Sequence, residues 1–120
     1  MQIWGCVLSE VSAKALELRA VLNEIMPPIR AKYGNFDSWD AKMAYQRAIA
    51  ERGWTAPGWP EEIGGKGLTL DERLDCDAEL QSFGAPQSPS VFGTANVGPT
   101  IAAVGNDEQK KHLKAILDVS

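Results

Sequence analysis

Residues 53–69, with the sequence GWTAPGWPEEIGGKGLT, constrain the fold more than any other part of this chain. The prolines remove backbone donors and the glycines weaken regular structure, so neither a helix nor a strand can run through this stretch. A connector of this length stays ordered only when large side chains hold it to the core. The sequence therefore predicts that Trp54 and Trp59 are buried anchors, and it favours this interpretation over an aromatic cage for a ligand. We call residues 53–69 the connector.

Two helical patterns precede the connector. Apolar residues at alternating spacings of three and four over residues 8–25 predict a first amphipathic helix. The proline pair at 27–28 is expected to stop that helix, because proline removes a backbone hydrogen bond. A second helix is predicted to begin after residue 37 or 38 and to end at Arg52, with Gly53 in a left-handed closing conformation.

The segment after the connector carries a helix-start signal. Thr69 and Glu72 have the spacing of a capping box, in which each side chain satisfies a backbone donor at the start of a helix. The predicted third helix runs from there to about Phe83, and the turn at Gly84 ends it. Its apolar side chains are spread over a wide arc, so we expect burial on more than one side. They are Leu70, Leu74, Cys76, Ala78, Leu80 and Phe83.

Residues 91–104 are uncharged and mostly small. This composition predicts a central helix that its neighbours approach closely, with Pro99 bending or restarting it near Gly98. The room left by the small side chains can be filled either by a neighbouring helix or by an apolar ligand tail. Asn106 can cap a last helix, with Gln109 at the capping-box position. The residues expected to face inward from that last helix are Leu113, Ile116 and Leu117.

These patterns predict an all-α fold, with about five helices in an up-and-down, bundle-like layer joined by the long ordered connector. A hydrophobic content of 44% over 120 residues suits one domain, residues 1–120, with a real core. The net charge of −4 disfavours nucleic acid as a partner. The sequence predicts neither a signal peptide nor a membrane span, and Cys6 and Cys76 lack the spacing of a metal site, so a reduced cytoplasmic protein is expected.

Three motifs could carry chemistry, and each has a simpler interpretation. Adjacent Glu61 and Glu62 point apart in a loop and lack a convergent partner for acid–base work. His112 lies among lysines, which favours a solvated surface histidine. The run GGKG at 64–67 lacks the spacing of a nucleotide-binding loop, so its glycines are interpreted as turn residues. No residue is predicted to be catalytic or to bind a metal.

Three segments, taken in order, resemble the N-terminal helical domain of FAD-dependent acyl-CoA dehydrogenases. They are QRAIAERGWTAPGWP at residues 46–60, VGPT at 97–100 and GNDEQKK at 105–111. Each motif alone is weak, but their order and separation over residues 15–117 make a strong joint signal. The resemblance implies an FAD flavoprotein, an oxidoreductase of lipid metabolism that acts in fatty acid β-oxidation.

In that family the N-terminal helical domain precedes a β-domain and a C-terminal helical bundle, and FAD lies between the latter two. A glutamate base removes the α-proton of an acyl-CoA thioester while a hydride passes from the β-carbon to the flavin. This chain ends about where the family enters its β-domain, so the resemblance implies a truncated protein that forms one wall of the substrate cavity. Carried over by position, the residues of the acyl-tail wall are Ser88, Pro89, Phe92 and Asn96.

The leading hypothesis is therefore the N-terminal domain of an acyl-CoA dehydrogenase, inactive alone and without useful affinity for FAD, because the main FAD-binding segments are absent. The alternative is a stand-alone, non-catalytic helical interaction module derived from that fold. A reading frame that continues past Ser120 into the missing domains favours the first. We expect self-association, or pairing with the missing domains, through apolar surface left bare. That surface is expected at Leu74, Leu80, Phe92 and Ile101.

Overall fold

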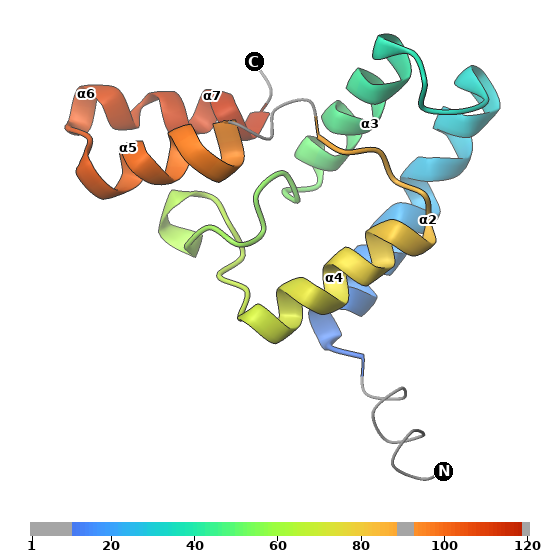
Figure 1. Cartoon of the computed structure of the whole chain (residues 1–120), viewed down its shortest axis with the longest axis horizontal. Helices are drawn as coiled ribbons and strands as arrows, with labels where there is room; N and C mark the ends of the chain where they lie inside the picture. The colour runs from blue at the N-terminus through green and yellow to red at the C-terminus, as the bar shows by residue number, and fades with distance from the viewer. Residues whose placement is uncertain (1–10, 89–92, 119–120) are drawn as a thin grey trace, which may run out of the picture.

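The computed structural model describes residues 11–88 and 93–118, and the regular structure in these ranges is entirely helical, which confirms the all-α prediction (Figure 1). The elements in chain order are α2 (Ala13–Tyr33), α3 (Trp39–Glu51), the 3-10 turn η1 (Glu61–Ile63), α4 (Leu70–Ser82), the π-helical turn η2 (Gly93–Val97), α5 (Gly98–Val104), α6 (Asp107–Lys110) and α7 (His112–Asp118). Within the described ranges, no helix combines the length and apolar character that crossing a bilayer requires.

The first helix is longer than the sequence predicts. Ser12 caps its first turn, and Gly34, with φ of 80°, ends it. The prediction that Pro27 and Pro28 stop this helix is wrong, because α2 continues through both. Both prolines are exposed, so the carbonyl groups that lose their backbone partners can bond to water instead. Residues 8–10, where the helix was expected to begin, lie outside the described residues.

The first core lies where α2 packs against α3 and α4. The spacing of three and four along α2 places one stripe of side chains inside, as predicted. Tyr45 and Ile49 face this stripe from α3, and Cys76 faces it from α4. The buried residues of α2 are Ala15, Leu18, Leu22, Ile25 and Met26.

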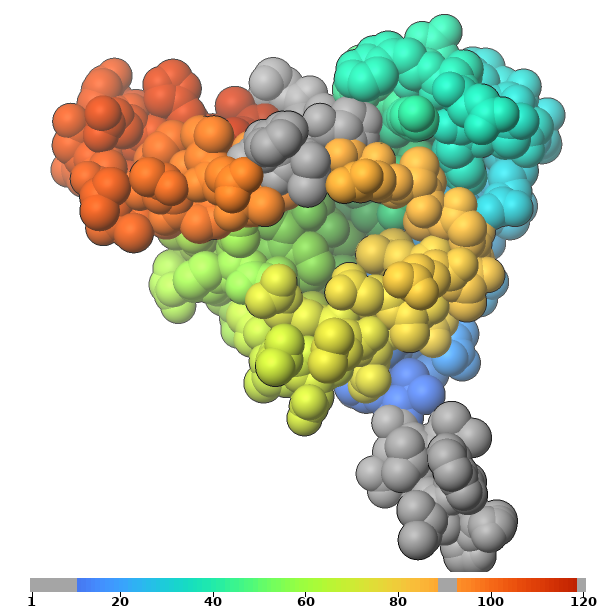
Figure 2. Space-filling model, in the orientation of Figure 1, coloured from blue at the N-terminus to red at the C-terminus, as the bar shows by residue number. Residues whose placement is uncertain are grey.

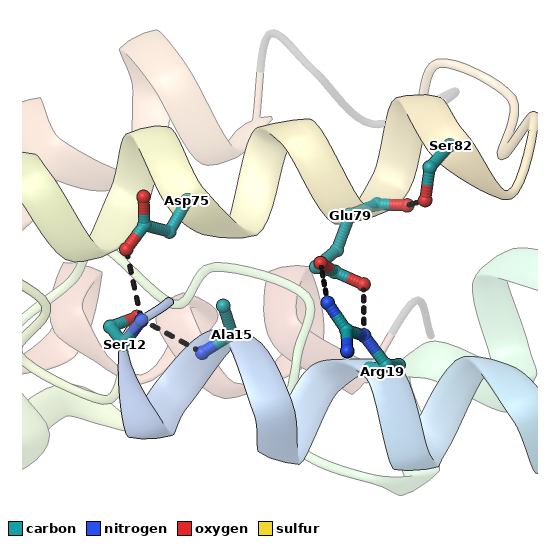
Figure 3. A network of polar contacts seen from close by, with 6 residues as sticks. All are labelled: Ser12, Ala15, Arg19, Asp75, Glu79 and Ser82. Atoms are coloured by element: carbon teal, nitrogen blue, oxygen red, sulfur yellow. Dashed lines mark hydrogen bonds and ion pairs between the residues drawn. The ribbon is translucent and has the colours of Figure 1, made fainter. Parts of the chain in front are cut away.

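A charged pair joins α2 to α4 beside this core (Figure 3). Arg19 donates from Nε and Nη2 to the two carboxylate oxygens of Glu79, at 2.8 and 2.7 Å. Nearer the start of both helices, the backbone N–H of Ser12 donates to Asp75 Oδ2 at 3.1 Å. Glu79 is only 9% exposed. The hydrogen bonds from Arg19 hold the pKa of Glu79 below its ordinary value, despite this burial.

The structure confirms the predicted start of α4, but the burial of this helix differs from the prediction. The capping box is complete: Thr69 N–H donates to Glu72 Oε1 at 2.9 Å, and Glu72 N–H donates to Thr69 Oγ1 at 3.2 Å. The expected wide arc of burial is wrong, because Leu70 and Leu74 are 68% and 57% exposed. One face of α4, which carries Cys76, packs on the first core, while the face with the two leucines is open to solvent in the described part of the chain.

The connector is held by both of its tryptophans, as predicted. Trp54 N–H donates to the carbonyl of Ile49 at 3.0 Å, and its ring is buried in the first core. Trp59 is buried in a second cluster, with Ala56 and Leu113. The connector therefore joins two hydrophobic clusters of the described chain. The half-buried residues around the second cluster are Ile63, Ile101, Ala102, Ile116 and Leu117.

Trp59 also fixes the helices that follow. The Trp59 Nε1 donates to the carbonyl of Thr94 at 2.8 Å. The Trp59 ring also lies against Gly98, where an added Cβ would be only 2.2 Å from the Cζ2 atom of the ring. Glycine at 98 is thus the residue that lets α5 approach the indole so closely. The helix restarts at Gly98, as predicted, but it is not central: Val104 is 79% exposed. Ile101 and Ala102 of this seven-residue helix pack against the second cluster, which contains residues of both the connector and α7.

The last predicted helix is present with one break. Asn106 and Gln109 form the predicted capping box, with bonds of 2.9 and 3.0 Å between side chain and backbone. α6 and α7 follow, separated at Lys111. Leu113 is buried as expected, and the other two inward-facing residues pack against the second cluster.

Replacing Trp59 with alanine should lower the free energy of unfolding by about 3–5 kcal/mol, because a large buried aromatic ring and its hydrogen bond are lost together. Urea unfolding followed by circular dichroism measures this. The control is Trp39→Ala: Trp39 is 64% exposed, so its loss should change stability by about 0.5 kcal/mol or less. Equal effects of the two substitutions would contradict the anchoring role of Trp59.

Arg19→Met should destabilise the fold at neutral pH, because the buried Glu79 carboxylate loses its partner. A carboxylate with a lowered pKa stabilises the fold above its ordinary pKa of 4.5, and this contribution disappears as the pH falls through the lower pKa of the folded state. The difference in the free energy of unfolding between wild type and Arg19→Met should therefore become small in acid. Lys14→Met removes an exposed pair on the same helix and serves as the control. A difference in the free energy of unfolding that stays constant with pH would contradict the stabilising role of the Arg19–Glu79 pair.

Candidate functional site

A cavity of about 850 Å³ lies between the connector, α3, α4 and α5. Figure 2 shows the connector, in green, recessed between α5 in orange and α4 in yellow. The two ends of the connector, at Trp54 and Leu68, reach the first cluster, and its middle, at Trp59, reaches the second, so the cavity is framed by both clusters. Its size falls within the usual range for pockets that hold small molecules or cofactors.

The wall of this cavity is mainly apolar, and several polar side chains also line it. Ile49 and Leu80 contribute from α3 and α4, and Ala102 contributes from α5. Arg73 and Asp77 are exposed charged residues on the α4 side, and the Arg73 side chain lies over Gly58, where a Cβ would stand 3.0 Å from Arg73 Nε. Such a wall suits an apolar ligand whose orientation a few polar groups define.

Three buried groups with polar or titratable atoms line the same cavity. Burial raises the pKa of Tyr45 to about 12. Burial, followed by nearby carboxylates such as Asp75, raises the pKa of the Cys76 thiol to about 11, so this cysteine is a weak nucleophile at neutral pH. Gln46 is 1% exposed, and its amide oxygen Oε1 has no hydrogen-bond partner in the described structure.

These three residues were not identified as site residues from the sequence. Ala41, Tyr45, Gln46 and Ile49 are the buried residues of α3, and the spacing of four from 41 to 49 defines a single inward face. In the sequence, Gln46 beside that face could have indicated a site residue, because a long polar side chain among buried neighbours needs a hydrogen-bond partner. The sequence alone does not show that a cavity, rather than a neighbouring helix, lies against it.

The four residues expected to form an acyl-tail wall are distributed unevenly. Ser88 is half-buried and lines the cavity. Asn96 is exposed and lines a separate, shallower hollow of about 430 Å³ with Pro99. Pro89 and Phe92 lie outside the described residues.

The motifs given a simpler interpretation behave accordingly. Glu61 and Glu62 are exposed in η1, and His112 is exposed at the start of α7. In the glycine-rich run, a Cβ on Gly64 would lie 2.4 Å from Leu117 Cδ1, and one on Gly65 would lie 2.0 Å from the Trp59 carbonyl oxygen. At these two positions the glycines let the chain's own atoms pack closely together.

Comparison with protein families matches most of this chain to one family. The family described as acyl-CoA dehydrogenase, N-terminal domain, matches residues 12–117. The chain is 35% identical over 85 residues to acyl-CoA dehydrogenase IpdE1 of Mycolicibacterium smegmatis, covering 70% of the chain and 22% of that protein. It is 38% identical over 101 residues to acyl-CoA dehydrogenase FadE26 of Mycobacterium tuberculosis, covering 79% of the chain and 24% of that protein.

Solved structures agree with this assignment. The Tcur3481-Tcur3483 steroid ACAD aligns with a TM-score of 0.65 and 31% identity, covering 87% of this chain and 27% of the other. The ChsE4-ChsE5 complex from Mycobacterium tuberculosis aligns with a TM-score of 0.65 and 28% identity, covering 91% and 28%. This chain thus spans less than a third of the proteins it matches. The chain belongs to the acyl-CoA dehydrogenase family and corresponds to the N-terminal domain of its members.

Proposed function

We propose that this domain forms one wall of the acyl-group cavity of an FAD-dependent enzyme that introduces a double bond between the α- and β-carbons of an acyl-CoA thioester. The observation that carries the proposal is the apolar cavity of about 850 Å³ within a chain whose family match covers residues 12–117. In this reaction FAD accepts a hydride, and other parts of the enzyme hold it. The domain's own residues bind the acyl group and exclude water.

The substrate we propose is bulkier than a straight fatty chain. A relative of known structure carries the name steroid ACAD, and a cavity of about 850 Å³ has room for a ring system. Ser88, which lines the cavity, and Asn96, on the π-helical turn nearby, remain our proposed contacts for the acyl group. Pro89 and Phe92 belong to the same proposed wall.

We also propose that the domain pairs with other chains or domains. The ChsE4-ChsE5 relative is a complex of two named proteins. Four large apolar side chains of the described chain are exposed on α4, η2 and α5, where a partner could cover them. They are Leu70, Leu74, Val97 and Val104.

A domain exchange tests the catalytic proposal. Residues 12–117 replace the matching segment of Mycolicibacterium smegmatis IpdE1, and the readout is the loss of flavin absorbance after mixing with acyl-CoA thioesters under anaerobic conditions. We expect the chimera to be reduced by at least one thioester of a panel that contains straight and polycyclic acyl groups. The unmodified enzyme is the control. A chimera that holds FAD, is reduced by dithionite and responds to no thioester would contradict the proposal.

Light scattering over a concentration series tests the pairing proposal on the isolated 120-residue chain. We expect dimers or larger species at micromolar protein, because exposed apolar patches drive association. The double substitution Leu70→Lys and Leu74→Lys should shift the chain toward monomer, whereas Leu16→Lys, on α2 and outside the proposed surface, shows the effect of added charge alone. A chain that is monomeric at every concentration would favour the stand-alone module instead.

A further inference from the structure

The Arg73 side chain spans two walls of the cavity, α4 and the connector. It starts on α4 and reaches Gly58, where an added Cβ would stand 3.0 Å from Arg73 Nε and 3.3 Å from its Cδ and Cζ atoms. Arg73 is exposed and lines the cavity, so its side chain is open both to solvent and to a molecule that enters. Glycine at 58 leaves the space in which the guanidinium lies against the connector.

The guanidinium of Arg73 is unpaired in the described part of the chain. It forms neither an ion pair nor a hydrogen bond there, although Asp77 lies one turn further along α4 and lines the same cavity. Arg19, by contrast, donates from two nitrogens to the carboxylate of Glu79. A guanidinium is a planar group with five donors, and it binds carboxylate and phosphate groups through pairs of parallel bonds. The donors of Arg73 are therefore available to an anion.

The rest of the wall indicates what such an anion is attached to. Apolar side chains from three helices line the same cavity, among them Ile49, Leu80 and Ala102. An inorganic anion would leave these side chains uncovered, and a hydrocarbon would gain nothing from the guanidinium. A ligand that uses both features has an apolar part inside the cavity and a negative group beside α4.

We propose that the cavity binds a ligand with an apolar body and an anionic group, a carboxylate or a phosphate, and that Arg73 binds the anionic group. Asp77 is the other charged residue of the described chain that lines this cavity, and its carboxylate repels such a ligand. The two side chains lie four positions apart on α4, so they act on the same anion with opposite sign. That the ligand is an acyl-CoA thioester rests on the proposed function; the preference for an anion does not.

Fluorescence titration of the 120-residue chain separates the anionic group from the apolar body. 8-Anilinonaphthalene-1-sulfonate and N-phenyl-1-naphthylamine share one body, and only the first carries an anion, a sulfonate that stands in for the carboxylate or phosphate. We expect wild type to prefer the anionic probe about fivefold more than Arg73→Gln does, as befits one exposed charge pair. High salt should reduce this difference, because the site is open to solvent. Asp77→Asn should increase the preference.

Arg47→Gln is the matched control, because Arg47 is exposed on α3, does not line the cavity and carries the same charge. Its ratio of dissociation constants for the two probes should equal that of wild type. Gly58→Val keeps the charge of Arg73 but fills the space beside its Nε, so the preference should fall toward that of Arg73→Gln. The neutral probe reports any change that this substitution makes in the cavity itself.

Competition with the anionic probe distinguishes two sources of the anion. 2-Naphthoate presents a carboxylate, as an acyl group with a second acidic end does, and 2-naphthyl phosphate presents a phosphate, as CoA does. We expect at least one of them to displace the probe from wild type, and to bind about fivefold more weakly to Arg73→Gln. The stronger competitor identifies the anion that the site prefers.

Four results would overturn the proposal: the neutral probe does not bind wild type, Arg73→Gln keeps the wild-type ratio, Arg47→Gln changes the ratio as much as Arg73→Gln does, or neither naphthyl anion competes. The assays contain neither CoA nor flavin. A failed domain exchange together with an anion preference that depends on Arg73 would therefore contradict the proposed function and leave this inference intact.

Discussion

The burial of the Trp59 indole is the interaction on which the rest of this structure depends. Its ring fills the second cluster beside Ala56 and Leu113, and its Nε1 is bonded to the carbonyl of Thr94. Gly98 lies directly against the ring, so the start of α5 is positioned by the same side chain. One residue in the middle of the connector thereby fixes both the course of the connector and the position of the helix that follows it.

The cavity is a consequence of this arrangement. Trp54 ties one end of the connector to the cluster of α2, α3 and α4, while Trp59 ties the middle to α5 and α7. The cavity lies between these two attachments, where neither cluster fills the space completely. The cavity is partly open to solvent and mainly apolar in its lining, as are many sites that hold small molecules. The attachment of the connector at Trp54 and Trp59 thus determines both the fold of this domain and the position of the proposed cavity wall.

Local signals in the sequence predict most of the helix ends, and long-range packing explains the failures. Ser38, Thr69 and Asn106 cap their helices with their own side chains, an interaction that spans three residues and is therefore legible in the sequence. Whether Leu74 is covered and whether Gln46 lies beside a cavity depend on segments far away in the chain. Two residues of the predicted acyl-tail wall, Ser88 and Asn96, line different hollows, and their role in binding stays a prediction.

Hydrogen exchange of the backbone amides tests the central role of Trp59 most directly. In Trp59→Ala, we predict that amides of α5 and α7 lose far more protection than those of α2, because the ring packs in the second cluster and not in the first core. Trp39→Ala should leave both groups unchanged, because Trp39 is exposed. Retained protection in α5 and α7, or an equal loss along the whole chain, would contradict the account.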